Sequence, residues 1–223
     1  MGNLYLVRHG QASFGEADYD QLSSLGQKQS LRLGQYFAAK GLKFDAFITG
    51  NLRRHQQTLA GILQGLEHEA EPLLWPGLNE YDGEALIAAI HPDPLPHAGT
   101  PELVKQHFRL LRKGLHHWMA GKTEPLGMPS YVDFAAGIAG ALDHVKAEHF
   151  GKNVLIVSSA GPIANAVGQV LEAPAQSIIE LNMRIRNTAL TEFSFTPKRH
   201  SLVTYNAVPH LDSAEHADWV TFV

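Results

Sequence analysis

Short apolar runs alternate along the chain with longer segments of helical periodicity. Residues 4–7 and 154–157 are wholly apolar, as in parallel strands that are buried on both faces. Between such runs, apolar residues recur every three or four positions, as expected of helices that cover a sheet. The pattern predicts strands at 4–7, 44–49, 73–75 and 154–157, a closing strand pair at 189–195 and 202–205, and helices at 24–40, 52–66, 104–118, 131–145 and 161–171.

The alternation of strands and helices is typical of an α/β protein. We therefore predict a three-layer α/β/α sandwich with a central, mainly parallel sheet. A length of 223 residues suits one domain with a substantial core. Four prolines between residues 91 and 101 exclude regular helix there. We expect residues 1–223 to form a single domain with a helical and loop insertion around 91–132.

Composition narrows the classes of partner and cofactor. A net charge of -4 and a pI near 6.3 leave no basic field for nucleic acid, and no apolar stretch has the length of a membrane span. No secretion signal precedes residue 4, so a cytoplasmic location is expected. Because the chain has no cysteine, no His-Glu-x-x-His spacing and no glycine-rich nucleotide loop, we expect chemistry without a metal or other cofactor.

Polar motifs follow four of the predicted strands. They are Arg-His-Gly at 8–10, Leu-Arg-Arg-His-Gln-Gln-Thr at 52–58, Leu-Asn-Glu at 78–80 and Ser-Ser-Ala-Gly at 158–161. Open α/β sheets bind ligands at the carboxyl ends of their strands. We therefore expect the four motifs to meet at one edge of the sheet.

Together these motifs resemble the histidine phosphatase superfamily, also called phosphoglycerate-mutase-like, over nearly the whole chain. The family's Arg-His-Gly motif matches residues 8–10, and its acidic residue after the third strand matches Glu80. Its late Asn-x-x-x-His-Leu segment resembles residues 206–211, where we expect Asn206 and His210 to be structural. Its Leu-x-Arg-x-x-Gln-Thr motif matches Leu52, Arg54, Gln57 and Thr58.

The resemblance implies a phosphatase that hydrolyses a small phosphomonoester. A neutral His9 would attack phosphorus and form a phosphohistidine, which divides one difficult displacement into two easier ones. Arg8 and Arg54 would bind phosphoryl oxygens through their planar, charged forks. Glu80 would protonate the departing alkoxide and then deprotonate the attacking water.

Two of these assignments have neighbours that compete with them. Asp82 and Glu84 lie close to Glu80 and are alternative proton donors. Arg53 stands beside Arg54 and is the alternative phosphate-binding arginine, although the motif favours Arg54. The sequence alone leaves both alternatives open.

The fourth motif departs from the family. Where the family usually has a second histidine, this chain has Ser159, followed by Ala160 and Gly161. The backbone N–H groups of Ala160 and Gly161 would still bind phosphate at a helix start, and the Ser159 hydroxyl would add a neutral donor. We expect slow turnover that Ser159→His would raise, unless Arg184 and Arg186, on one face of an extended segment, supply the missing charge.

Two other functions compete with hydrolysis. Phosphoglycerate mutases share the Leu-Asn-Glu segment, but usually continue it with basic residues, whereas this chain continues with Tyr-Asp-Gly-Glu at 81–84. Acidic side chains at the entrance of the site would repel a bisphosphate. Loss of the second family histidine would also fit a weakly active or phosphate-binding pseudoenzyme. The substrate and the oligomeric state are not encoded in these motifs.

Overall fold

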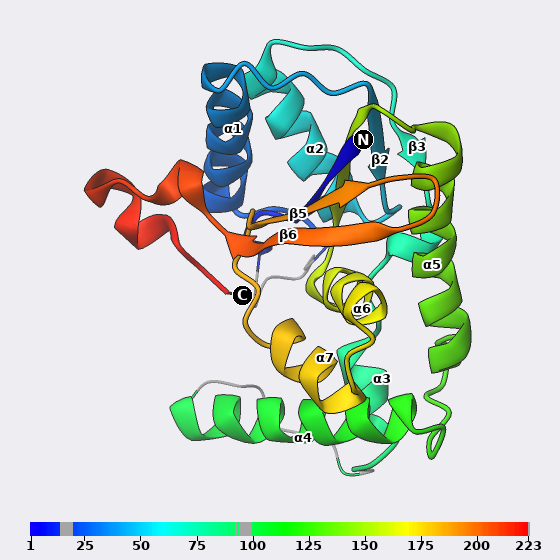
Figure 1. The fold of residues 1–223 in the computed structure, drawn as a ribbon. Helices are drawn as coiled ribbons and strands as arrows, with labels where there is room; N and C mark the ends of the chain where they lie inside the picture. Colours follow the sequence, from blue (N-terminus) through cyan, green and yellow to red (C-terminus); the bar gives the residue numbers. More distant parts are fainter. Residues whose placement is uncertain (14–19, 92, 94–99, 223) are drawn as a thin grey trace.

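A six-stranded sheet in the order β3-β2-β4-β1-β5-β6 forms the centre of the molecule (Figure 1). The computed structural model describes residues 1–13, 20–91, 93 and 100–222. The first four strands pair in parallel, whereas the last two add an antiparallel edge. The strands are β1 (Gly2–Arg8), β2 (Ala46–Thr49), β3 (Leu73–Leu74), β4 (Asn153–Ser158), β5 (Leu190–Phe195) and β6 (His200–Ala207). The predicted α/β fold with a mainly parallel sheet is confirmed.

Strand β1 contributes to two hydrophobic cores, one on each face of the sheet. Leu4 and Leu6 belong to one core, and Tyr5 and Val7 belong to the other. Successive side chains of a strand point to opposite faces, so a strand buried on both faces must be apolar throughout. This explains why the sequence shows a continuous apolar run rather than an alternating one.

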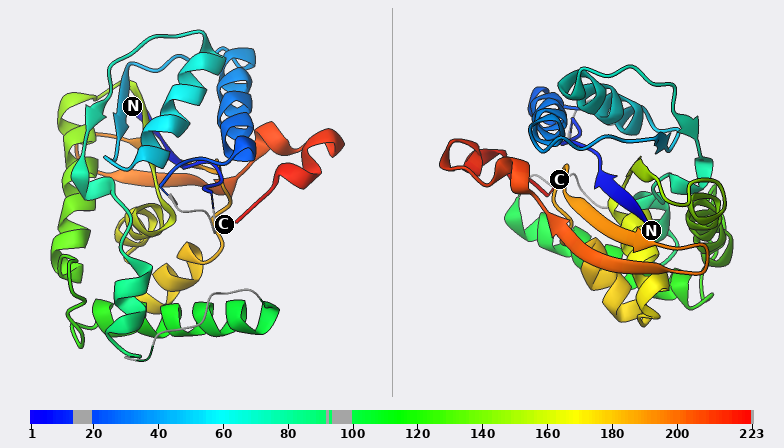
Figure 2. Two further views of the ribbon diagram at one scale, coloured as in Figure 1. Left: turned by 180° about the vertical axis from the view of Figure 1, so that it is seen from behind. Right: turned by 45° about the horizontal axis from the view of Figure 1, so that its top comes forward.

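Helices cover both faces of the sheet (Figure 2). Helices α1 (Ser24–Ala39) and α2 (Arg53–Leu66) pack on the Tyr5 side, and α5 (Tyr131–Glu148) and α6 (Ala160–Leu171) pack on the Leu6 side. Helix α4 lies across the lower end of the molecule in Figure 1, below α3 and α7. The remaining elements are α3 (Gly83–Ala88), α4 (Pro101–Met119), α7 (Ala175–Asn182) and the 3-10 turns η1 (Pro76–Leu78), η2 (Pro209–Leu211) and η3 (Ala214–Trp219).

Several local predictions need correction. Helices α3 and α7 were not predicted, because each is too short to show a clear periodicity. Helix α1 is capped by Ser23, whose hydroxyl accepts the N–H of Gly26 at 3.0 Å. Arg184 and Arg186 do not lie in an extended strand, because the chain turns directly after α7. Residues 92 and 94–99 of the predicted proline-rich loop lie outside the described residues.

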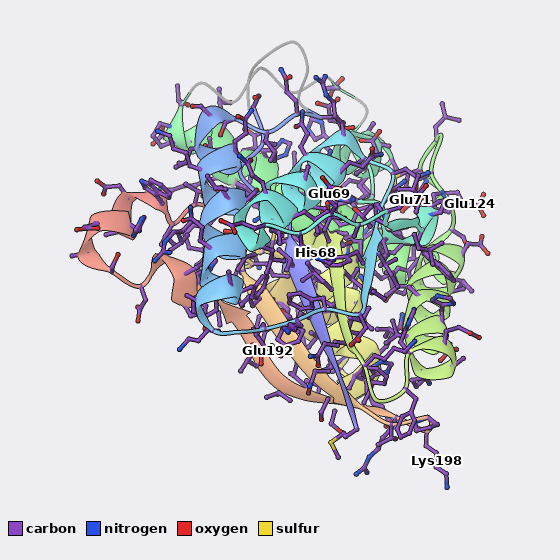
Figure 3. All side chains as sticks on the ribbon, turned by 90° about the horizontal axis from the view of Figure 1, so that it is seen from above. His68, Glu69, Glu71, Glu124, Glu192 and Lys198 are labelled. Carbon is purple, nitrogen blue, oxygen red and sulfur yellow. The ribbon has the colours of Figure 1, made fainter. Side chains whose placement is uncertain are left out.

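Several charged side chains lie on the surface of the molecule. Seen from above, Glu124 and Lys198 lie at its edge, and both are exposed, as are Glu69 and Glu71 (Figure 3). No helix in the described part of the chain is long and apolar enough to cross a membrane.

Helices α1 and α2 pack with unusually close backbones. A Cβ atom at Gly34 would lie 2.1 Å from the carbonyl oxygen of Ile62 and 2.9 Å from Cα of Gly65. A Cβ atom at Gly65 would in turn lie 2.3 Å from the carbonyl oxygen of Leu31. Only glycine fits at this crossing, which lies near the C-terminal end of α2.

We predict that Gly34→Ala destabilises the protein, because the new methyl group forces the two helices apart. Overpacking of this kind costs about 1–3 kcal/mol in the free energy of unfolding, measurable by urea denaturation. Gly83→Ala is the matched control, since its nearest neighbour would be Cδ1 of Leu111 at 3.5 Å, an ordinary contact. Equal effects of the two substitutions would contradict the close-crossing explanation.

Candidate active site

The Arg-His-Gly segment is fixed between β4 and α2 at the carboxyl edge of the sheet. The N–H of His9 donates to the carbonyl of Ser158 at 2.9 Å. The N–H of Gly10 donates to Oγ1 of Thr58 at 3.0 Å, and this hydroxyl donates to the carbonyl of Arg54 at 2.7 Å. A chain of hydrogen bonds thus links the end of β4, the Arg-His-Gly segment and the first turns of α2.

The imidazole of His9 is held in one tautomer. Its Nδ1 lies 2.7 Å from the carbonyl oxygen of Gly10, which can only accept, so Nδ1 carries the proton and Nε2 presents a lone pair. The side chain is buried, and burial lowers its pKa well below the usual 6.5, with further lowering by the charges of Arg8 and Arg54. His9 is therefore neutral at physiological pH.

Two buried guanidinium groups act on His9. Arg8 is 9% exposed and donates to the carbonyls of Ile185 and Phe222, the latter at 2.8 Å. Arg54 is 7% exposed and pairs with the Asp20 carboxylate at 2.7 Å. Arg53, the alternative to Arg54, is exposed. The geometry therefore places Arg54 in the site, as the motif indicated.

Glu80 reaches the site from the turn after η1. Its two carboxylate oxygens accept the Gly161 N–H at 3.2 and 3.1 Å. Burial raises its pKa, against the opposing effects of this hydrogen bond and of the charges of Arg54 and Arg8. A raised pKa favours the protonated form that a general acid needs.

The other candidate carboxylates do not share this environment. Asp82 caps α3 by accepting the N–H groups of Glu84 and Ala85 at 2.9 and 3.0 Å, and both acidic side chains are exposed. Their roles in the structure are those of a helix cap and of an acidic residue in a first helical turn, both of which stabilise a helix start. Glu80 is the acidic residue in contact with the start of α6.

Gly161 has a different role from the one expected. Its N–H, which we expected to bind phosphate, donates to Glu80, and a Cβ atom there would lie 2.1 Å from Oε1 of Glu80. Helix α6 begins at Ala160, so the expectation of an anion-binding helix start at Ala160 stays a prediction. Glycine at 161 is required for the carboxylate to approach the helix.

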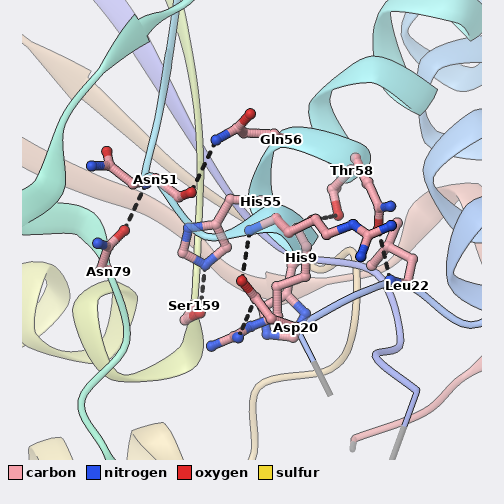
Figure 4. A network of polar contacts seen from close by, with 12 residues as sticks. His9, Asp20, Leu22, Asn51, His55, Gln56, Thr58, Asn79 and Ser159 are labelled. Atoms are coloured by element: carbon pink, nitrogen blue, oxygen red, sulfur yellow. Dashed lines mark hydrogen bonds and ion pairs between the residues drawn. The ribbon is translucent and has the colours of Figure 1, made fainter. Parts of the chain in front are cut away.

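Ser159 forms a hydrogen bond with His55, a histidine to which the sequence motifs gave no role. The Oγ atom of Ser159 lies 2.6 Å from Nε2 of His55, and both side chains are fully buried (Figure 4). The ring centroid of His55 is 5.7 Å from that of His9. Burial, and then the charge of Arg54, lowers the pKa of His55 to about 3. His55 was detectable in principle, because it follows Arg54 in the first turn of a helix at the sheet's carboxyl edge.

The C-terminal motif holds a turn together. The Asn206 side chain accepts the N–H of Arg186 at 2.8 Å and donates to the carbonyl of Arg184 at 2.7 Å. The guanidinium of Arg186 donates to the carbonyl of Asn206, and Arg184 is exposed. His210 lies 2.8 Å from Oγ1 of Thr188. These contacts fit the structural role expected of Asn206 and His210, and show no contact of either arginine with His9.

Among the residues that the structure describes, no group of three or more histidine, aspartate or glutamate side chains could hold a metal ion. Among the described residues, the charges that lower the pKa of His9 include those of Arg8 and Arg54. The groups gathered at this edge are therefore suited to a phosphoryl anion.

Comparison with known proteins assigns the chain to a family. A sequence profile of the histidine phosphatase superfamily (branch 1) matches residues 4–208. The chain belongs to the histidine phosphatase superfamily. The match includes all four motifs at the sheet edge, so the resemblance inferred from them is confirmed.

Sequence relatives within this superfamily include both phosphatases and mutases. A broad-specificity phosphatase of Saccharomyces cerevisiae is 31% identical over 76 residues, which cover 31% of this chain and 33% of the relative. A 2,3-bisphosphoglycerate-dependent phosphoglycerate mutase of Xanthobacter autotrophicus is 40% identical over 76 residues, or 31% of this chain and 36% of the relative. The aligned part thus spans about a third of each relative.

Solved structures share the fold over nearly the whole chain. Phosphoserine phosphatase from Entamoeba histolytica, in complex with 3-phosphoglyceric acid, has a TM-score of 0.66 at 22% identity, and covers 95% of this chain and 100% of its own. A mycobacterial glucosyl-3-phosphoglycerate phosphatase has a TM-score of 0.65 at 22% identity, with 92% and 98% coverage. At these identities the likeness concerns the fold.

We predict that Asp20→Asn strengthens the binding of inorganic phosphate. The Asp20 carboxylate pairs with Arg54 and also accepts the N–H of Arg53 at 2.9 Å. The amide keeps an oxygen for that N–H but removes the negative charge that competes with phosphate for Arg54. A partly exposed ion pair is weak, so a gain on the order of threefold in affinity is expected by calorimetry.

Asp20→Ala separates the two effects of this residue. It removes the charge and the oxygen that caps α2, so it should bind phosphate at least as well as the wild type but unfold more easily. Weaker phosphate binding by Asp20→Asn would show that Asp20 assists the anion rather than competing with it.

Proposed function

We propose that this protein is a metal-independent phosphatase that hydrolyses a small phosphomonoester through a phosphohistidine at His9. The observation that carries the proposal is the hydrogen bond from Nδ1 of His9 to the Gly10 carbonyl. It leaves the Nε2 lone pair available beside two buried guanidinium groups. A neutral imidazole in a cationic site suits attack on an anionic phosphoryl group.

The first step transfers the phosphoryl group to His9. Nε2 forms the bond to phosphorus as the bond to the ester oxygen breaks, and Glu80 gives its proton to the departing alkoxide. Arg8 and Arg54 balance the charge on the equatorial oxygens. The products of this step are an alcohol, a phosphohistidine and an ionised Glu80.

The second step restores the enzyme. Ionised Glu80 takes a proton from a water molecule, whose oxygen attacks phosphorus as the bond to Nε2 breaks. Inorganic phosphate leaves, His9 is again neutral, and Glu80 is again protonated. One carboxyl group thus serves both steps, first as acid and then as base.

The relatives support hydrolysis and keep a mutase as the second candidate. One sequence relative is named a broad-specificity phosphatase, and another a phosphoglycerate mutase. A mutase must retain a doubly charged substrate after the first transfer, whereas the segment after Glu80 presents the exposed carboxylates of Asp82 and Glu84. These charges favour a substrate with one phosphate group.

The decisive test is a screen of phosphomonoesters with and without chelator. Turnover should survive chelator, and His9→Ala should reduce it to background because the nucleophile is gone. Rapid acid-free quenching and mass spectrometry should detect a phosphoryl group on His9 in the wild type. Transfer between two substrate hydroxyls without release of phosphate would favour the mutase, and full activity of His9→Ala would contradict the proposal.

Glu80→Gln should affect substrates according to their leaving groups. An alkyl phosphate needs a proton on the departing oxygen and should slow about 10²–10⁴-fold, whereas 4-nitrophenyl phosphate, with its stable leaving anion, should slow far less in the first step. Equal losses for both substrates in single-turnover experiments would contradict the role of Glu80 as an acid.

The pKa shifts predict the pH profile of kcat/KM. The lowered pKa of His9 keeps the nucleophile neutral at pH values well below 6.5, so the acidic decline should lie below that value. The raised pKa of Glu80 keeps the acid protonated above the usual 4.5, and activity on alkyl phosphates should fall as the pH rises through it. The alkaline decline should disappear in Glu80→Gln.

A further inference from the structure

The side chains of His55 and Ser159 form a buried, hydrogen-bonded pair beside His9. Nε2 of His55 lies 2.6 Å from Oγ of Ser159, and neither side chain is exposed to solvent. Ser159 occupies the N-cap position of α6, yet its hydroxyl makes no capping hydrogen bond to the helix. The direction of this hydroxyl is therefore set by His55 and not by the helix that it precedes.

The surrounding backbone makes room for the His55 ring. A Cβ atom at Gly50 would lie 2.4 Å from Nδ1 of His55 and 2.7 Å from Oδ1 of Asn79. The Asn79 oxygen accepts the N–H of Asn51 at 2.7 Å, which fixes the other wall of this space (Figure 4). The ring is thus confined to one position, with Nε2 directed at Ser159.

The position of the proton on His55 follows from its partners. His55 lies in the first turn of α2, beside Arg54, where the helix dipole and a neighbouring cation both disfavour a charged ring. A neutral ring has one N–H group, and Nδ1 has no hydrogen-bond partner among the described residues. A proton on Nδ1 would leave a buried N–H unpaired, which is rare and costs about 1–3 kcal/mol. A proton on Nε2 instead donates to Ser159.

Given the phosphatase function above, on which this inference rests, we propose that His55 is a positioning residue for Ser159. The Nε2–H of His55 donates to the Ser159 oxygen, so the serine hydroxyl keeps its own proton to donate to an oxygen of the phosphoryl group on His9. The pair supplies one oriented, neutral donor at the position where the family usually has a histidine.

The same geometry argues against Ser159 as a nucleophile. A histidine that activates serine accepts the hydroxyl proton at one nitrogen, while its other N–H is held by an acceptor. Nδ1 of His55 has no such acceptor in the described part of the chain. The very low pKa of His55 would also make it a poor base. The hydrogen bond therefore orients the hydroxyl and does not deprotonate it.

Matched substitutions distinguish positioning from packing. Ser159→Ala should lower kcat about 10²–10³-fold with little change in KM, as expected for loss of a preorganised donor. His55→Leu fills the space without a donor and should approach the Ser159→Ala rate. His55→Gln keeps an N–H near the Nε2 position and should retain activity within about tenfold of the wild type. His68→Gln, at an exposed histidine beyond α2, is the control.

Two kinetic outcomes would overturn the proposal. Because the two residues act as one unit, His55→Leu combined with Ser159→Ala should be no slower than Ser159→Ala alone. Losses that multiply in the double variant would show that the residues act independently. A wild-type rate in Ser159→Ala would show that the hydroxyl is not used.

Exchange of the two residues provides a third kinetic comparison. From the sequence we expected Ser159→His to raise the rate, but His55 already fills the adjacent space. Ser159→His alone should therefore slow the enzyme through crowding, and adding His55→Ala should raise the rate at least tenfold above that single variant. Retention of wild-type activity by Ser159→His alone would overturn the proposal.

A spectroscopic test is independent of turnover. Nitrogen-15 NMR of the imidazoles should show the His55 proton on Nε2 and the His9 proton on Nδ1. A proton on Nδ1 of His55 would overturn the positioning role, whereas a proton on Nε2 of His9 would overturn the proposed nucleophile and leave the His55 assignment intact. Calorimetry with inorganic phosphate should show the same affinity in His55→Leu as in Ser159→Ala. Different affinities in these two variants would contradict the pairing even if no substrate turned over.

Discussion

Two buried positive charges at the carboxyl edge of the sheet act on both His9 and Glu80. Arg8 and Arg54 are almost fully removed from solvent, so each guanidinium must be compensated, by backbone carbonyls in one case and by Asp20 in the other. Their charge acts in opposite ways on its neighbours. It disfavours a charged His9 and favours an ionised Glu80, while burial works in the other direction on Glu80. The acid-base properties of the site thus follow from burial first, and from these two charges second.

Glycine residues, which have no side chain, shape the site as much as its polar side chains do. Glycine at position 10 lets the loop approach α1, because a Cβ there would lie 2.5 Å from the carbonyl of Gly26. Gly161 admits Glu80, and Gly50 admits His55. Each glycine permits a polar group to come closer than any side chain would allow. The positions of the polar groups are therefore fixed by backbone packing and not only by hydrogen bonds.

Periodicity and motif order were sufficient to predict the layers of the fold, and they pointed to most of the residues that the structure brings together near His9. Buried strands are readable because they are apolar on both faces, and polar motifs at their ends are readable because parallel strands end together. The short helices α3 and α7 were not predictable, since six or eight residues give too little periodicity. The position of His55 at the sheet edge was predictable, but the contact of His55 with Ser159 and that of Asp20 with Arg54 were not. Each of these contacts joins segments that are distant in the sequence. A single polar residue has no sequence pattern from which such a contact could be predicted.

The hydrogen bond from Arg8 to the Phe222 carbonyl links residues that are 214 positions apart. Nearby, the Gln29 side chain donates to the carbonyl of Trp219, and the Asn187 N–H donates to the carbonyl of Thr221. During synthesis on the ribosome, the N-terminal Arg-His-Gly segment emerges first, whereas these acceptors emerge more than two hundred residues later. Contacts of such long range form late, because the loop between them must be closed at the cost of chain entropy. The growing chain can therefore assemble helices α1 and α2 well before Arg8 acquires its final orientation.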